Sequence, residues 1–466
     1  MTEPALSMLL ERLLWPVPRV RREVGRSLAR LIREGDREVA RSLLNWISVR
    51  RLESEAVLGL GIIDAFDLGD HFEFAEVSEA VRAPSHLSDW LLKKNFTDAR
   101  GLSTFRYEVS PPEPATLPQG EEAMFERYRK QAVPPIFSTV LSELHELTGF
   151  PFLQRWEHEW RWLQATDPRP APALLHFFSH GERDRIGQFD PGQRELYVSA
   201  YLRTLAFAAI SGVMPHPAAE QYALLALTMN RGLADLEPID RPEWTLNLLP
   251  CEAGRTYELA RKLWERAEAA AKPGEAPLAL RVVDVDTEGF IEIDTTLTIG
   301  PPGFTAETAE ADELSYLTVN QSPGRMTGLV GEQPKKHPPE RPLVMSQVVL
   351  PLDIGLTHIE VAPNVRLASP DVFGTSATIH CDHSEIRLEA GANVFSRWVH
   401  WYANWEPTKS PKLKSAVGSM TTVSKANLNR LRALSGVEIA RLVRVCRAVR
   451  PASYKDYEAE EEAFWA

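Results

Sequence analysis

The first seventy residues carry apolar side chains at the spacing of short amphipathic helices. In residues 17–36 they recur three or four positions apart and fall on one helical face: Val20, Val24, Leu28 and Leu31. Gly35 suits the end of this helix, and Asp36 can cap the next one. The same spacing returns in residues 39–47 and 57–63. We therefore predict three short helices that bury their apolar faces against one another, because none can bury its face alone.

The opposite face of the first predicted helix is basic. It carries five arginines: Arg19, Arg22, Arg26, Arg30 and Arg33. Residues 1–51 hold eleven arginines against six acidic residues, a net charge of +5 in a chain whose overall charge is −12. Such a stripe is either a solvated helix face or a surface for an acidic protein or a phosphate backbone. We predict that these five arginines bind a partner.

This N-terminal text resembles a known class of helical repeat. In PRVRREVGRSLARLI a proline starts the helix, and a Val–Arg pair precedes a stretch rich in Ala and Leu. These features resemble the HEAT family, over about the first 70 residues. Because HEAT-like units usually present binding surfaces, the resemblance implies interaction rather than catalysis. No strict repeat period continues beyond this region.

Farther along, the chain changes from helical to strand-like patterns. Pro-rich text at 108–122 and at 166–173 interrupts the helical patterns, and from residue 278 β-branched residues alternate as in strands. We predict an α+β fold, with an all-helical N-terminal half that contains HEAT-like repeats and a strand-rich mixed C-terminal half. The predicted regions are a HEAT-like region 1–107, a helical domain 123–275, a strand-rich domain 278–450 and an acidic tail 451–466.

Composition places the chain among globular, multi-domain proteins. Hydrophobic residues make up 44% of its 466 residues and charged residues 25%. No stretch approaches the about 18 apolar residues of a membrane helix, and the N-terminus does not read as a signal peptide. The three cysteines are far apart, which argues against a disulfide framework. We expect a cytoplasmic protein without a membrane partner.

Residues 393–414 combine aromatic and basic side chains. Three tryptophans recur there at helical spacing and three lysines follow: Trp398, Trp401, Trp405, Lys409, Lys412 and Lys414. Aromatic rings stack on bases and lysines hold phosphates, so single-stranded nucleic acid is one candidate partner. The alternative is an apolar helix face packed on a core.

Three groups of residues are candidates for chemistry. Acids on a predicted hairpin could hold the metal of a nuclease or form a solvated face: Asp284, Asp286, Glu292 and Asp294. Cys251 or Cys381 could be the nucleophile of a cysteine protease together with the text HFFSHG at 176–181, which is otherwise a loop. The run His380-Cys381-Asp382-His383 contains zinc-ligand types, but neighbours on a strand point to opposite faces. Because no complete set is present, we expect no metal and no cofactor.

The C-terminus reverses its charge. Residues 409–450 carry +9, whereas the last sixteen residues hold five acids and one lysine. We hypothesise that the acidic tail shields the basic region or serves as a handle for a partner. The alternative is a solvated, mobile tail.

These patterns favour binding over catalysis. We expect a binding, adaptor or sensor subunit of a larger intracellular assembly, with a protein as its main partner and nucleic acid as a second possibility. The combination of helical repeats with a β region resembles accessory and sensor proteins of bacterial antiviral defence systems. The alternative function is a hydrolase, either a metal-dependent nuclease or a cysteine protease.

Overall fold

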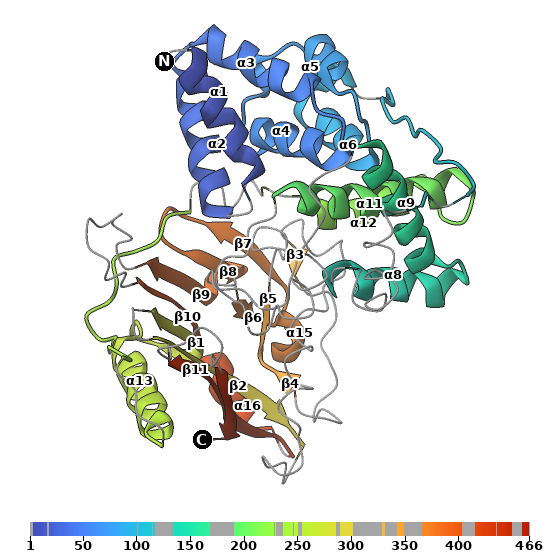
Figure 1. The fold of residues 1–466 in the computed structure, drawn as a ribbon. Helices are drawn as coiled ribbons and strands as arrows, with labels where there is room; N and C mark the ends of the chain where they lie inside the picture. The colour runs from blue at the N-terminus through green and yellow to red at the C-terminus, as the bar shows by residue number, and fades with distance from the viewer. Residues whose placement is uncertain are drawn as a thin grey trace. The chain divides into compact units, whose positions relative to one another are not determined.

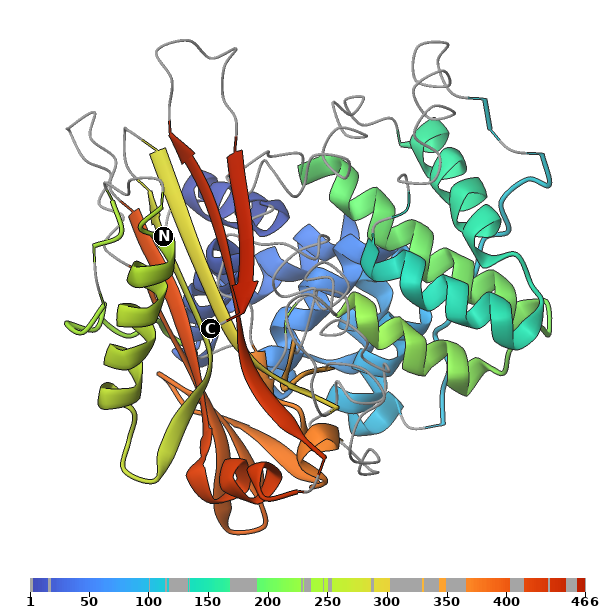
Figure 2. The same ribbon diagram turned by 90° about the horizontal axis from the view of Figure 1, so that it is seen from below.

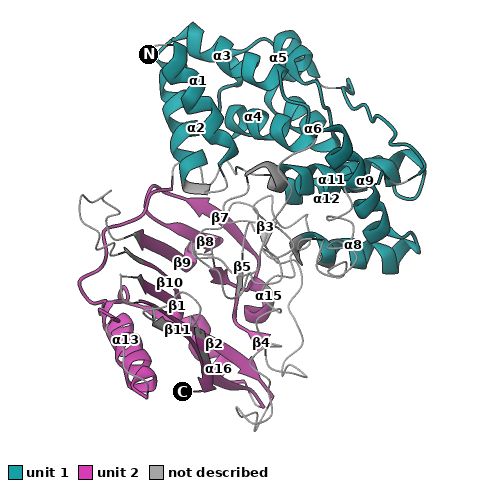
Figure 3. Cartoon of the chain, in the orientation of Figure 1, with its two compact units in different colours: residues 1–234, 350–360 teal, residues 235–349, 361–466 magenta. Residues whose placement is uncertain are grey.

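The structure is a computed structural model that describes most of the chain. The described residues are 3–15, 18–99, 101–113, 115–116, 133, 135–167, 191–227, 229, 236–245, 247–249, 254–285, 289–301, 329–330, 343–348, 366–402, 415–434, 436–449 and 459–465. Two compact units divide them: residues up to 229 belong to the first, and those from 236 belong to the second (Figure 3). Each unit is described below by itself.

The first unit is helical (Figure 1). Its α-helices are α1 (Glu3–Glu11), α2 (Pro18–Arg33), α3 (Arg37–Ser48), α4 (Glu53–Ala65), α5 (Phe74–Ala80), α6 (His86–Asn95), α8 (Pro135–Thr148), α9 (Phe152–Thr166), α11 (Pro191–Ile210) and α12 (His216–Ala223). The three helices predicted in the first seventy residues are confirmed as α2, α3 and α4. Among the described helices of the chain, none combines the length and the apolarity that a membrane crossing requires.

The orientation of α2 follows its apolar pattern. Val24 and Leu28 are fully buried, as predicted, and the buried face extends to Arg21 and Ile32. The helix ends at Gly35, whose φ of +90° favours glycine. The predicted cap of α3 is present, since the Asp36 carboxylate accepts hydrogen bonds from the backbone N–H groups of two residues in its first turn.

Helix α4 is the centre of the first unit. All of its residues are buried, and it packs against α2, α3, α6 and α11. A side chain at Gly59 would overlap Ile47, so the glycine allows α3 to approach α4 closely. Gly61 has more room, because an added Cβ there would lie 3.8 Å from the Met229 Cβ.

The second unit is built on an antiparallel sheet. Its strands are β1 (Glu275–Val285), β2 (Gly289–Gly300), β3 (Leu329–Val330), β4 (Leu343–Val344), β7 (Ala377–Cys381), β8 (Ile386–Ala390), β9 (Asn393–Tyr402), β10 (Ser415–Ser424), β11 (Glu438–Val449) and β12 (Ala459–Trp465). The order is β12-β11-β2-β1-β10-β9-β8-β7-β3, and β4 pairs with β2. A separate pair joins β5 (Ser346–Val348) and β6 (Arg366–Ala368).

Helices of the second unit accompany this sheet. They are α13 (Thr256–Ala270), α15 (Pro370–Phe373) and α16 (Lys425–Arg432), and α13 lies along one face of the sheet (Figure 2). The sequence grouped α13 with the helical region 123–275, whereas its contacts with β1 and β2 place it in the sheet unit. The α+β architecture predicted from the change of pattern is confirmed, with the helices of the first unit followed by the strands of the second.

One local prediction is wrong, and one alternative fails for part of the tail. Trp398 and Trp401 lie on strand β9 and not on a helix, because β8 and β10 pair with it on both sides. Both faces of β9 are buried at this point, so apolar residues three apart do not imply a helix there. The alternative of a solvated tail does not hold for residues 459–465, which form strand β12 on the edge of the sheet; the hypothesis of a shield or a handle stays a hypothesis.

Candidate functional site: an arginine surface and a buried charge cluster

The predicted arginine stripe occupies the outward side of α2. Arg30 and Arg33 are exposed, while Arg22 and Arg26 are half-buried. Arg26 forms an ion pair with Glu23 at 3.4 Å. The Arg33 guanidinium donates to the backbone carbonyl that follows α4, which fixes this side chain to the fold. Arg19 lies in α2, but its side chain lies outside the described residues.

The next helix also carries exposed basic side chains. Arg37 and Arg41 of α3 are exposed as well. The stripe of α2 alone does not reveal them as site residues, because they belong to the next helix. Their presence means that the positive charge of residues 1–51 covers two helices rather than one.

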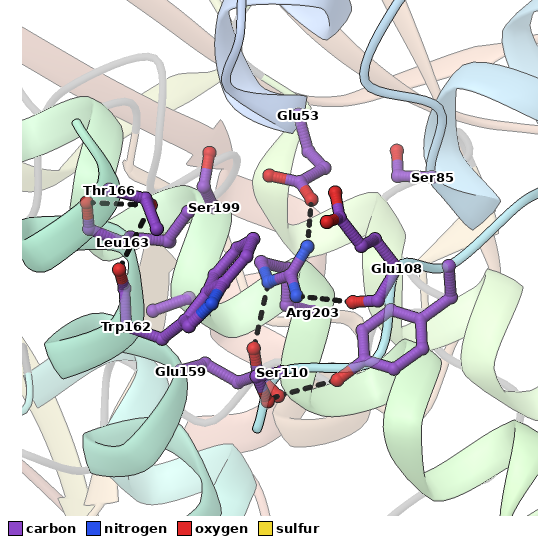
Figure 4. Close-up of polar contacts among 12 residues, drawn as sticks. Glu53, Ser85, Glu108, Ser110, Glu159, Trp162, Leu163, Thr166, Ser199 and Arg203 are labelled. Carbon is purple, nitrogen blue, oxygen red and sulfur yellow. Dashed lines mark hydrogen bonds and ion pairs between the residues drawn. The ribbon is translucent and has the colours of Figure 1, made fainter. Parts of the chain in front are cut away.

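A second feature, which sequence analysis missed entirely, is a charge cluster inside the first unit (Figure 4). Arg203 of α11 is only 4% exposed. Its Nη1 donates to Glu53 Oε1 and its Nε donates to Glu159 Oε2, both at 2.8 Å. Its Nη2 donates to the Glu108 carbonyl at 2.6 Å. The guanidinium is therefore bound on three sides by three different segments of the chain.

The other oxygen of Glu159 completes the cluster. It accepts hydrogen bonds from the Tyr107 hydroxyl at 2.5 Å and the Ser110 hydroxyl at 3.0 Å, and it pairs with Arg155 one helical turn away. With Glu53 and Arg203, the cluster contains two carboxylates and two guanidinium groups. The charges therefore balance inside the protein, as buried charges must.

The two carboxylates differ in their ionisation. Burial raises the pKa of Glu159, but the nearby guanidinium of Arg203, the Tyr107 hydrogen bond and Arg155 outweigh it, so the pKa lies below its usual value. Burial raises the pKa of Glu53 more than Arg203 lowers it. Burial and the Glu159 carboxylate raise the pKa of Tyr107 to about 12, so this phenol stays a neutral donor.

The cluster connects segments of the first unit that are far apart in the sequence. It joins the 101–113 segment to α4, α9 and α11, and the Trp162 ring lies 4.1 Å from the centre of the Arg203 guanidinium. Since a buried ion pair is satisfied in one geometry only, it fixes how these elements pack. The sequence contains one indication of it, which is a single arginine within the apolar text YLRTLAFAA.

The predicted nucleic-acid residues do not form a stacking platform in the described part of the chain. Trp398 and Trp401 are 1% and 0% exposed. Trp398 stacks on His400 with ring centres 4.8 Å apart, whereas Trp401 covers Gly418 and meets Trp244 edge-on. Neither ring offers a face to a base. The other four predicted residues lie outside the described residues: Trp405, Lys409, Lys412 and Lys414.

The hairpin acids are distributed over both faces of the sheet. Glu292 accepts from Arg281 at 2.9 Å, and the Asp294 carboxylate accepts two hydrogen bonds from the guanidinium of Arg366 on β6. On the opposite face, Asp284 accepts from the backbone N–H of Leu248 at 2.8 Å. Asp286 lies outside the described residues. The described acids are thus engaged by separate partners and do not converge as nuclease ligands would.

The remaining candidates do not assemble a metal site. His380 and His383 are exposed, and His380 lies 3.5 Å from the Glu389 carboxylate. Among the residues that the structure describes, no group of three or more His, Cys, Asp or Glu side chains is placed to hold a metal ion. Cys251 and the segment 176–181 lie outside this part of the chain. Comparison with known proteins adds no family, since no protein-family model matches the sequence and no curated protein shows significant similarity to it.

Proposed function

We propose that the protein is a binding or adaptor subunit of a larger assembly, and that the outward face of α2 contacts an acidic surface of a partner protein. The observation that carries the proposal is the position of Arg22, Arg26 and Arg30. They lie on the side of α2 opposite the buried Val24 and Leu28. The resemblance of this segment to HEAT repeats, and of the chain to defence-system accessory proteins, supports the same class of role.

The two faces of α2 have different roles. The inner face supplies apolar burial, while the outer face carries the exposed Arg30 and the half-buried Arg22 and Arg26. Exposed substitutions typically change stability by no more than about 0.5 kcal/mol. Guanidinium groups bind carboxylates in a bidentate geometry, and a cluster of them accelerates encounter with an acidic surface.

An acidic protein fits this face better than nucleic acid does. A nucleic-acid surface without sequence readout usually combines cations with exposed aromatic rings. The predicted rings of Trp398 and Trp401 are buried. The outward face of α2 offers guanidinium groups at one-turn intervals, and carboxylates on a partner helix can match this spacing.

Charge reversal tests the proposal. The variant Arg22→Glu, Arg26→Glu, Arg30→Glu should melt within a few degrees of the parent chain and should lose the partner that the parent captures from its native host. The matched control reverses three exposed cations of α13: Arg261, Lys262 and Arg266. The control should retain the partner. Equal retention, or equal loss, by both variants would show that the α2 face is not the binding surface.

A further inference from the structure

The C-terminal strand β12 occupies the edge of the sheet. It runs antiparallel to β11, with Trp465 opposite Leu442 and Ala459 opposite Ala448. Strand β11 pairs on its other side with β2, whereas β12 has β11 as its one neighbour in the sheet order. Residues 459–465 thus cover an edge of β11 with which no other described strand of the unit pairs.

Every second residue of β12 contacts a particular group beside it. The Glu460 carboxylate pairs with Arg447 of β11. The Glu462 carboxylate accepts a hydrogen bond at 2.8 Å from the hydroxyl of Thr256, the first residue of α13. The Phe464 ring lies 5.3 Å, between centroids, from that of Tyr257. These contacts alternate as side chains on one face of a strand do.

This is the chemistry by which proteins recognise an added strand. Backbone hydrogen bonds supply affinity, and alternate side chains supply specificity. Arg447 selects a carboxylate at one position. Thr256 selects a second carboxylate two residues later, where the positive end of the α13 dipole favours an anion. Tyr257 selects an aromatic ring two residues after that.

The strand is weakly held compared with the sheet behind it. Glu460, Glu462 and Ala463 are exposed, and the Glu460 side chain is 61% exposed. By contrast, β11 buries Leu442, Val443 and Val445. The aromatic residues of β12, Phe464 and Trp465, are half-buried and none of its described side chains is fully buried. A segment that buries less apolar surface than its neighbour opens at a lower free-energy cost. Strand β12 is therefore the part of the described sheet most easily displaced at that edge.

We propose that the edge of β11, together with Thr256 and Tyr257 at the N-terminus of α13, is a binding site for an extended acidic segment of a partner protein, and that β12 occupies it in the free chain. The segment carries carboxylates at two positions spaced as Glu460 and Glu462 and an aromatic residue at the position of Phe464. This inference does not depend on the α2 face, because the two surfaces use different residues. The tail is thus a tethered competitor of the partner.

Tethering sets the size of the effect. A segment joined to its binding site within one chain has an effective concentration of about 1 mM. We assume an intrinsic Kd of about 100 µM for the free peptide. The ratio of effective concentration to Kd is then about ten, so the tail would occupy the edge of β11 in about ten chains for each chain in which that edge is free. The apparent affinity of the free peptide for the full chain should then fall about tenfold.

A labelled peptide with the sequence of residues 459–465 is the probe. Its binding is measured by fluorescence anisotropy to the full chain and to a full-length variant with an undocked tail: Glu460→Lys, Glu462→Lys, Phe464→Ser. The variant should bind the peptide about tenfold more tightly than the parent. A peptide in which lysines replace the glutamates at 460 and 462 should not bind. Adding Arg447→Met to the undocked variant should weaken the peptide again.

Several outcomes would overturn the proposal. One is equal affinity of the parent and the folded variant, and another is no binding to either of them. Dimers that form only when the native tail is present would also overturn it, because the strand would then serve a second copy of the chain. If the variant does not fold, a chain ending at residue 458 replaces it. Failure of both to fold would show that β12 is a fixed part of the sheet.

Discussion

Replacing Arg203 with methionine would test whether the buried charge cluster holds the first unit together. The substitution keeps a side chain of similar length but removes the cation between Glu53 and Glu159. Both carboxylates are buried. Removing one partner of a buried ion pair costs about 3–5 kcal/mol, because the remaining charge is left without compensation. Since domains are stable by about 5–15 kcal/mol, this is a large fraction of the total.

Urea denaturation followed by the helical circular dichroism signal measures this loss. At a slope of about 2 kcal/mol per molar urea, the midpoint of the helical unit should fall by roughly 2 M at pH 7. The control is Arg261→Met on α13, whose pair with Glu265 is exposed. It should change stability by no more than about 0.5 kcal/mol.

The pH dependence of the unfolding free energy tests whether the unpaired carboxylates of Glu53 and Glu159 cause the loss of stability. In the parent chain the lowered pKa of Glu159 stabilises the fold above about pH 4.5, and this contribution is lost as pH falls through the folded pKa. Without Arg203, burial should raise the pKa of both glutamates. The free-energy cost of burying their unpaired charge should shrink as they become protonated. The difference in unfolding free energy between the parent and the variant should therefore become smaller below about pH 5. A constant gap, or a loss under 1 kcal/mol, would refute the reasoning.

Three further substitutions test packing and ionisation in the first unit. Gly59→Ala should lower stability in thermal melts by about 1–3 kcal/mol because its methyl group overlaps Ile47, whereas Gly61→Ala should be nearly neutral; equal effects would contradict the close approach of α3 and α4. Burial and the neighbouring His216 lower the pKa of His86 from 6.5 to about 4, so stability is complete above pH 6.5 and should fall by up to about 3 kcal/mol as pH drops to 4. His86→Gln should flatten this part of the pH profile, and an unchanged profile would show that another group titrates.

Local periodicity predicts a substantial part of the fold. The spacing of Val24 and Leu28 defines the inner face of α2, and alternation predicts β1 and β2. In each case the information lies within a few neighbouring residues, because one face of the element is buried and the period is visible.

The remaining features depend on contacts between distant residues. Glu53 and Arg203 are 150 positions apart in the sequence, so no pattern among neighbouring residues predicts their ion pair. Trp398 and Trp401 resemble a helical stripe because both faces of β9 are covered, which removes the alternation that marks a strand. Strand β12 lacks an apolar period because its pairing with β11 is stabilised by backbone hydrogen bonds and carboxylate contacts.

The mass and composition of the native complex test the central claim most directly. A tagged chain isolated from its native host is analysed by light scattering and mass spectrometry. As a binding subunit, it should elute as a particle heavier than its own 52.4 kDa, with a second protein in a fixed ratio. The reversal of Arg22, Arg26 and Arg30 should release that protein. Isolation as a lone 52.4 kDa chain that turns over a nucleic-acid or peptide substrate would contradict the account.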